Sequence, residues 1–317
     1  MSFLVVAVAA STLLVLPAAT QRLGHRLAPA EWTWLAALAL AAGAGLLELA
    51  LVLRSVPAVL DAAGVDAVAD ACTRVFRPLL SGGPLVSWAA AAAAVLLAVT
   101  GTVAAGRGRR LRSRLAADLW LGDRVCIAGH DVVVLPVDPP LAASFETPEP
   151  VIVVSRGLID RLPTAELDVV VLHEAAHLAH RHQRLLTLTD VVAPVLGRLP
   201  VIRRSLAAVR LAVERWADEE ASAGSPERRA ALRRSLLCLI DAADQPPGFA
   251  GSAVFAEART LAARIDALAA PPTPVASVTR AALYLPGTGA AVTIAAGLYQ
   301  WGDQLRAVVA MTGRCSL

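Results

Sequence analysis

The sequence predicts an α-helical multi-pass membrane protein that carries one α+β domain. Of its 317 residues, 56% are hydrophobic and only 17% are charged, a balance typical of membrane proteins. Several apolar stretches approach the roughly 20 residues that a helix needs to cross a bilayer. Strand-like and helix-like patterns alternate in the more polar region between the third and fourth of these stretches. The formal net charge of +3 does not by itself indicate any partner.

Four apolar stretches are the predicted transmembrane helices. They cover residues 3–19, 34–53, 85–106 and 281–301. The last is weaker because it contains Pro286 and several glycines, which membrane helices tolerate. The first can alternatively be a signal peptide, although no strongly basic segment precedes it.

A basic run, RGRRLRSR at 107–114, directly follows the third predicted span. Positively charged loops next to membrane spans lie in the cytoplasm, so this run indicates orientation; we prefer that interpretation to a nucleic-acid surface. The amino terminus is then outside. The predicted domains are a three-helix membrane part at 1–106, a cytoplasmic domain at 107–276, and a fourth span with a short outer tail at 277–317.

The stretch VLHEAAHLAHRH, residues 171–182, contains four of the six histidines. The surrounding segment lacks Gly and Pro, and Thr164 can cap its start, so we expect a helix that continues through this stretch. His173 and His177 are four residues apart on one helix face. Glu174 lies between them. This H-E-x-x-H pattern supplies two metal ligands and a general base.

The third ligand has to come from elsewhere in the chain. His180 is about 10 Å along the helix axis from His173 at a rise of about 1.5 Å per residue, too far for zinc–nitrogen bonds of about 2 Å. A longer motif with a third histidine fails because His180 and Gln183 occupy its glycine and histidine positions. His182 points to the opposite face. We expect His180 and His182 to be solvated near the helix end.

A second helix, predicted at 205–222, carries Glu214 and Asp218 four residues apart. Glu214 would complete a His, His, Glu site with its fourth position open to water. Asp218 would accept the free ring N–H of a ligand histidine. Alternatively, these acids form a solvated helix face. The intervening 185–202 is apolar but broken by Pro and charges, which predicts a buried hairpin or a segment against the bilayer.

Two β-branched stretches, RVCIAGHDVVVLP and PVIVVS, predict strands before the histidine helix. We expect 144–150 to be a turn-rich link and His130 to be a solvated turn residue. The strand at 151–155 is expected next to the histidine helix, where an edge strand can bind an extended polypeptide. After the second helix, Ser225-Pro226-Glu227 is a good start for the first of two amphipathic helices.

The four cysteines and Glu48, an acid in a predicted span, allow further predictions. Cys72 and Cys315 both lie outside on this topology, where a disulfide can persist. Cys126 and Cys238 are expected to pack in the core. Glu48 lies inside the second span, so it is either a functional residue or pairs with a nearby arginine.

The segments HEAAHLAH and ERWADEEA, set among apolar spans, resemble the membrane metallopeptidases of the M56 family, the peptidase portions of β-lactam sensor-transducers. The related M48 family, which includes CAAX prenyl endopeptidases and heat-shock membrane proteases, shares H-E-x-x-H and E-x-x-x-D. The resemblance implies a zincin-like (gluzincin) fold in which His173, His177 and Glu214 bind Zn²⁺. Glu174 would be the general base and Asp218 would support a ligand histidine.

The group that stabilises the transition state is not evident from these motifs. The M48 pattern has a histidine shortly before an R-I-x-x-L element; ARIDAL at 263–268 resembles that element, but no histidine precedes it. The predicted cytoplasmic domain also contains no tyrosine. Arg264, His180 or the metal alone would then stabilise the transition state.

The resemblance implies an integral-membrane zinc endopeptidase that acts on protein substrates, in regulatory proteolysis of a cytoplasmic transcriptional repressor. One alternative is an M48-like protease for membrane-protein quality control. The other is a non-catalytic, zinc-stabilised scaffold or sensor, which the general base Glu174 and the open ligand position disfavour. The expected partners are a protein substrate and the lipid bilayer, without direct nucleic-acid binding.

Overall fold

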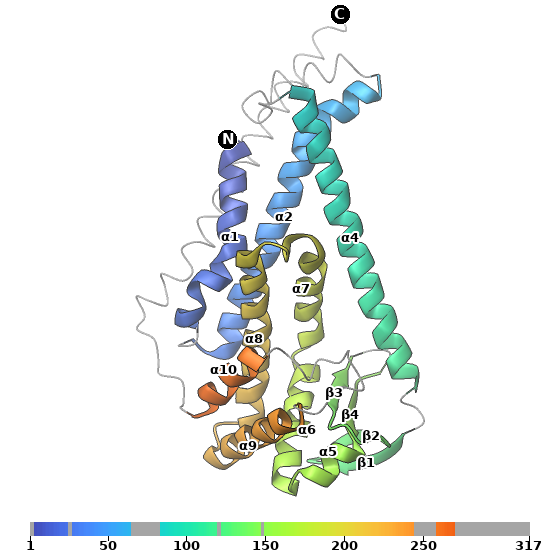
Figure 1. Cartoon of the computed structure of the whole chain (residues 1–317), viewed down its shortest axis with the longest axis vertical. Helices are drawn as coiled ribbons and strands as arrows, with labels where there is room; N and C mark the ends of the chain where they lie inside the picture. Colours follow the sequence, from blue (N-terminus) through green and yellow to red (C-terminus); the bar gives the residue numbers. More distant parts are fainter. Residues whose placement is uncertain are drawn as a thin grey trace, which may run out of the picture.

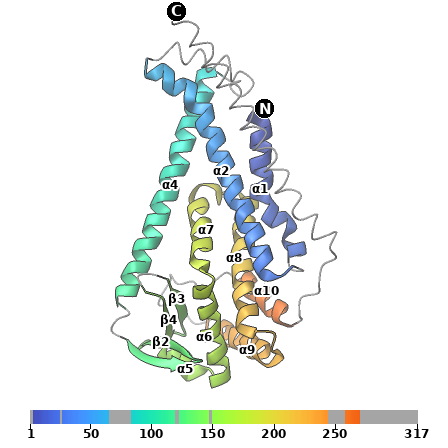
Figure 2. The same cartoon turned by 180° about the vertical axis from the view of Figure 1, so that it is seen from behind.

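The computed structural model of the chain is elongated, with long helices at one end and a small α+β region at the other (Figures 1 and 2). The structure describes residues 3–24, 27–64, 83–118, 122–146, 149–243 and 258–269. The fourth predicted span, Cys72 and Cys315 lie outside these residues, and so the expectations for them stay predictions.

Three long helices form the amino-terminal part. They are α1 (Phe3–Gly24), α2 (Pro29–Ala62) and α4 (Gly83–Asp118). Helices α1 and α2 lie side by side, whereas α4 diverges from α2 toward its carboxyl end (Figures 1 and 2). By length and composition, Pro29–Val56 and Gly83–Arg110 are candidate membrane spans, and Val6–Arg22 is a shorter apolar segment.

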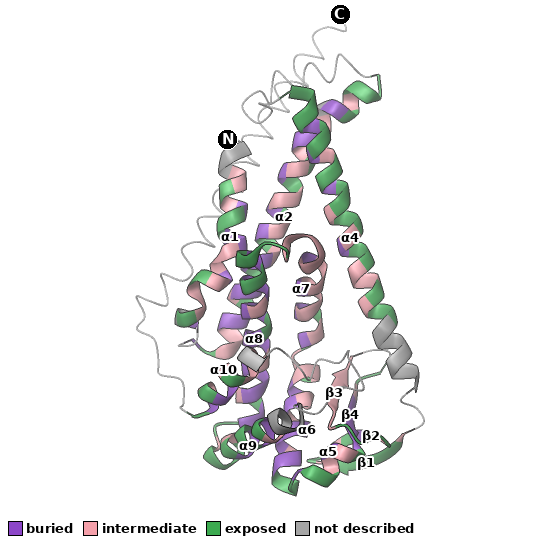
Figure 3. Cartoon of the chain, viewed as in Figure 1, coloured by how far each residue is buried: buried purple, intermediate pink, exposed green. Residues whose placement is uncertain are grey.

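Of the two candidate spans, α4 has the more exposed apolar surface. Only 17% of its apolar window is buried, against 39% for α2, and most of its length is exposed in Figure 3. Exposed large apolar side chains include Leu85, Trp88 and Val95. An apolar surface of this extent needs lipid or another protein to cover it, and this favours a membrane span over a core helix.

A four-stranded mixed sheet lies at the opposite end. Its strands are β1 (Asp123–Ile127), β2 (His130–Leu135), β3 (Ala142–Phe145) and β4 (Val151–Ser155), in the order β1-β2-β4-β3. Strands β2 and β4 are parallel; the two other pairs are antiparallel. The predicted strands correspond to β1, β2 and β4. His130 begins β2 and is partly buried.

Two expectations about the sheet are wrong. Strand β4 is central, because its run of apolar residues is buried along nearly its whole length, which is typical of an interior strand. The edge strand that packs against the histidine helix is β3. It includes Ser144 and Phe145 from the segment expected to be a turn-rich link; Ser144 pairs with Ile152 of β4.

In the described part of the chain, six helices follow the sheet. They are α5 (Arg156–Arg161), α6 (Thr164–Ala179), α7 (His182–Leu196), α8 (Pro200–Ser222), α9 (Pro226–Ala243) and α10 (Ala258–Ala269). Helix α6 packs on the sheet through Val170 and Val171, which contact the buried strand residues Val132 and Val154. Thr164 was expected to cap α6 but is its first helical residue; Pro163 occupies the cap position.

Helices α7 and α8 form a hairpin over 185–202, in which Leu185 and Val192 are buried; its tip exposes Leu199 and Val201, so contact with the bilayer stays a prediction. Leu206, Val209 and Val213 of α8 share one core with Trp32 and Leu40 of α2. Helix α7 also lies against α4, where a Cβ added at Gly101 would meet a Val191 methyl at 2.9 Å. The helix that carries Glu214 is therefore packed into the same core as the first long helices.

The structure also describes two of the cysteines and Glu48, for which the sequence predicted roles. Cys126 is exposed, so its expected core role is wrong: edge strand β1 has four exposed residues out of five. Cys238 is partly buried and packs against the core between the sheet and α6, as expected. The Oε2 atom of Glu48 is buried without a hydrogen-bond partner among the described residues. Arg54, one and a half turns further along α2, donates to Ser87 of α4.

Candidate metal centre

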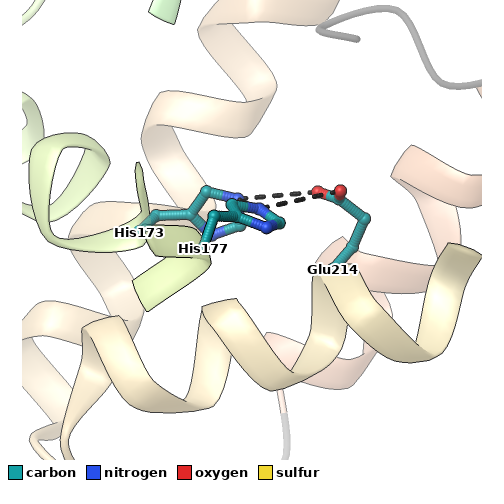
Figure 4. Close-up of side chains that lie close together, drawn as sticks. All are labelled: His173, His177 and Glu214. Carbon is teal, nitrogen blue, oxygen red and sulfur yellow. Dashed lines mark hydrogen bonds and ion pairs between the residues drawn. The ribbon is translucent and has the colours of Figure 1, made fainter. Parts of the chain in front are cut away.

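Three side chains from two helices converge at the centre of the α+β region. His173 and His177 come from adjacent turns of α6, and Glu214 comes from α8, which crosses α6 (Figure 4). The two Nε2 atoms are 3.1 Å apart. The carboxylate oxygens of Glu214 lie 3.5 Å from His173 Nε2 and 3.8 Å from His177 Nε2. One ligand atom from each residue lies within 4.8 Å of the other two.

These separations fit a zinc ion. Bonds of about 2.0–2.1 Å at tetrahedral angles place neighbouring ligand atoms about 3.3 Å apart, close to the three distances observed. Two imidazoles and one carboxylate are a ligand set found in catalytic zinc sites, which keep a fourth position for water or substrate. The donor set and its spacing therefore suit Zn²⁺ in a catalytic arrangement.

The electrostatics of the site follow from burial and opposite charges. Burial alone would lower the pKa of His173, but hydrogen bonding to Asp218 and Glu214 outweighs it and raises that pKa to about 9. Burial likewise opposes ionisation of Glu214, yet Arg264 and the two histidines hold its pKa well below the usual range. Burial lowers the pKa of His177. In the metal-free site these shifts favour the ionised form of Glu214 and the protonated form of His173.

Asp218 and Arg264 lie directly behind the ligands. Asp218 Oδ1 is 3.0 Å from Nδ1 of His173, the placement expected from the sequence. Arg264 comes from α10 and donates from Nη2 and Nε to Asp218 over 2.6 and 2.9 Å. Its Nη1 lies 2.9 Å from Oε2 of Glu214. The Arg264 guanidinium therefore links the carboxylates of Asp218 and Glu214.

Glu174, which lies between the two histidines on α6, makes a contact to the sheet. Its Oε2 accepts a 2.7 Å hydrogen bond from the hydroxyl of Ser144 on edge strand β3. The sequence did not indicate Ser144, because a four-residue strand of small residues beside a turn-rich segment has almost no β signal.

The end of α6 differs from the expected continuous helix. Helix α6 stops at Ala179, Arg181 adopts a left-handed conformation with φ of 53°, and α7 starts a new helix at His182. This break turns His182 toward the site, so its expected solvent exposure is wrong. Its side chain is fully buried, and its Nδ1 lies 3.0 Å from Nδ1 of His177. Burial and the neighbouring histidines lower the pKa of His182 to about 3.

His180 is placed apart from the three ligands. Its ring packs on Trp216 with centroids 4.5 Å apart, and its Nε2 lies 3.6 Å from Glu220. Its side chain is 30% exposed, which is less than the expected solvated state. It is not part of the cluster formed by His173, His177 and Glu214.

The H-E-x-x-H helix and the candidate ligand Glu214 from a later helix are together typical of a zinc metalloendopeptidase. Residues 127–221 match the model of Peptidase family M48, and this range includes all three ligands and Glu174. Residues 127–221 therefore correspond to an M48 peptidase domain, and the His173, His177 and Glu214 group within it suits Zn²⁺. Neither the curated proteins nor the solved structures contain a significant match.

Proposed function

We propose that this chain is a membrane-embedded endopeptidase that cleaves polypeptide segments close to the membrane surface, as in membrane-protein quality control. The observation that carries the proposal is the position of α8. Its second half carries Glu214, and its first half packs with α1 and α2 in one core. Because the helix that carries Glu214 packs against the candidate span α2, segments that emerge from the bilayer would be the nearest substrates.

The chemistry follows from the residues around the ligand cluster. Zn²⁺ bound by His173, His177 and Glu214 would polarise the scissile carbonyl and make the attacking water more acidic. Glu174 would serve as the general base, accepting a proton from the attacking water and returning it to the leaving amine. The hydrogen bond from Ser144 holds the Glu174 carboxylate in one orientation.

The position of β3 supports an endopeptidase over a zinc-stabilised scaffold. Its outer edge is not paired with any strand among the described residues, and it lies beside α6. An extended polypeptide can add to such an edge through backbone hydrogen bonds. Because Ser144 of this strand bonds Glu174, the added segment would run past the general base. A scaffold would need neither the base nor the open edge.

Orientation and domain boundaries belong to the same proposal. Arg107, Arg109 and Arg110 lie on the continuation of α4 beyond its apolar part, and this supports a cytoplasmic peptidase domain at 107–276 with the amino terminus outside. Proteolysis of a single cytoplasmic repressor, as the likeness to the M56 family implies, is the second candidate. The match to M48 favours quality control.

The test compares new protein amino termini in host cells that carry the wild-type chain or Glu174→Gln. We expect many membrane-protein fragments that depend on the wild type. A single cleaved DNA-binding protein would instead establish the repressor function. The purified variant should keep its zinc, because Glu174 is not among the ligands. If the two cell populations do not differ even under envelope stress, the scaffold alternative is preferred.

A further inference from the structure

Each ligand histidine has a second ring nitrogen, and the two are supported differently. Nδ1 of His173 faces a carboxylate, Asp218, at 3.0 Å. Nδ1 of His177 faces no carboxylate among the contacts observed; it lies 3.0 Å from Nδ1 of His182. The two rings meet edge to face, with an interplanar angle of 82°.

We propose that His182 is a positioning residue for the metal centre: its Nδ1 accepts the Nδ1–H of His177. This inference rests on the proposed zinc-peptidase function. Only one of two facing ring nitrogens can carry the shared hydrogen. If His177 Nε2 is to bind a metal ion, the hydrogen of His177 has to be on Nδ1. His182 therefore accepts with a bare Nδ1 and keeps its own hydrogen on Nε2.

The surroundings hold His182 in the orientation that this role needs. The left-handed Arg181 ends α6 and makes His182 the first residue of α7. Glu146, which directly follows β3, accepts a 3.1 Å hydrogen bond from the backbone N–H of Gln183. This places a carboxylate at the amino end of α7, where the helix dipole favours it. The α6–α7 break is thus fixed from the sheet side.

Trp216 fixes the ring of His182 from the other side. The two ring centroids are 4.7 Å apart, and Trp216 lies on α8, two residues after the ligand Glu214. His182 is fully buried between these elements. A buried polar ring with one contact to a ligand can contribute by orienting that ligand, since hydrogen-bond partners of ligand histidines fix the tautomer and strengthen metal binding.

The test uses the full-length chain in detergent and a matched pair of variants. His182→Asn keeps an acceptor oxygen near the position of Nδ1, whereas His182→Leu has a similar size and no acceptor. Zinc affinity is measured by competition with a chromophoric chelator, and the visible spectrum of the Co²⁺ form reports the ligand geometry. His130→Asn, at the start of β2, is the control.

We expect His182→Leu to bind zinc about 10- to 100-fold more weakly, with an altered Co²⁺ spectrum, and His182→Asn to recover most of that loss. Wild-type affinity in His182→Leu would overturn the proposal. An equal loss in the two variants would also overturn it, because it would indicate packing rather than the hydrogen bond. A wild-type chain that binds zinc but cleaves nothing would refute the proposed function and leave His182 testable.

A second measurement decides the question if His182→Leu does not fold. Selective ¹⁵N labelling of the histidines in the zinc-loaded wild-type chain distinguishes the ring tautomers. We expect hydrogen on Nδ1 of His177 and a bare Nδ1 on His182. Hydrogen on Nδ1 of His182 would overturn the proposal. A wild-type chain without affinity for zinc would remove both the proposed function and this inference.

Discussion

Replacing Arg264 by Met should destabilise the metal-free protein more than any exposed arginine substitution. Arg264 is 8% exposed, and its guanidinium has contacts at 2.6, 2.9 and 2.9 Å with the carboxylates of Asp218, which is buried, and Glu214, which is partly buried. Arg264→Met fills much of the same volume but leaves Asp218 and Glu214 without their shared cation. Breaking a buried ion pair by removing one partner costs about 3–5 kcal/mol.

The size of this loss sets the expected thermal shift. For a cooperative unit of 150–250 residues, about 2–4 °C is lost per kcal/mol, so the unfolding midpoint should fall by about 6–20 °C. Saturating Zn²⁺ should recover part of the loss, because the ion supplies positive charge next to Glu214. The zinc-induced rise in the midpoint should consequently be larger in Arg264→Met than in the wild type.

The assay is thermal unfolding of the purified chain in detergent, with a chelator or with excess Zn²⁺. Arg233→Met is the matched control, because Arg233 is an exposed residue of α9; it should change the midpoint by little. An unchanged midpoint for chelated Arg264→Met would refute the reasoning, since it would mean that the two carboxylates do not depend on this cation.

Three further outcomes follow from the structure. Ser144→Ala removes a hydrogen bond to the charged Glu174 carboxylate, worth about 1.5–3 kcal/mol, so kcat/KM should fall about 10- to 100-fold at unchanged zinc content; unchanged kcat/KM would contradict the role given to Ser144. In the metal-free chain the raised pKa of His173, about 9, stabilises the fold fully below pH 6.5, and this contribution is lost as the pH rises through 9. Zinc binding at pH 7–8 should therefore release a proton, and calorimetry in two buffers of different ionisation enthalpy would detect it; identical heats would contradict the expectation. Gly157→Ala should destabilise by about 1–3 kcal/mol, because the new Cβ would lie 1.7 Å from the Asp138 carbonyl oxygen, whereas Gly45→Ala, with open space around it, should be neutral or stabilising in the same unfolding assay.

The metal ligands could be predicted because they depend on spacing along regular helices. His173 and His177 share a face on any α-helix, whatever surrounds it. Glu214 and Asp218 repeat the same four-residue spacing, and the paired motifs indicated that these acids would approach the histidines. These residues lie together at the positions that the sequence predicted.

Ser144, His182 and the role of β3 could not be predicted, since they depend on where short irregular segments lie in space. A four-residue strand carries almost no periodic signal. The helix break at Arg181 contains neither Gly nor Pro, so local propensity gave no indication of it. The partners that stabilise the break, Glu146 and Trp216, are distant in sequence and adjacent only in the folded chain.

The sequence alone was enough to predict the apolar character of α2 and α4, the helix with the H-E-x-x-H motif and the class of chemistry, because helix periodicity and helix length are local properties. The tertiary structure decided which strand forms the edge beside Glu174 and which side chains support the ligands. It also decided that α8 joins the zinc ligand Glu214 to the core of α1 and α2. Contacts between residues far apart in the chain depend on the packing of whole elements, and no spacing within one element specifies that packing.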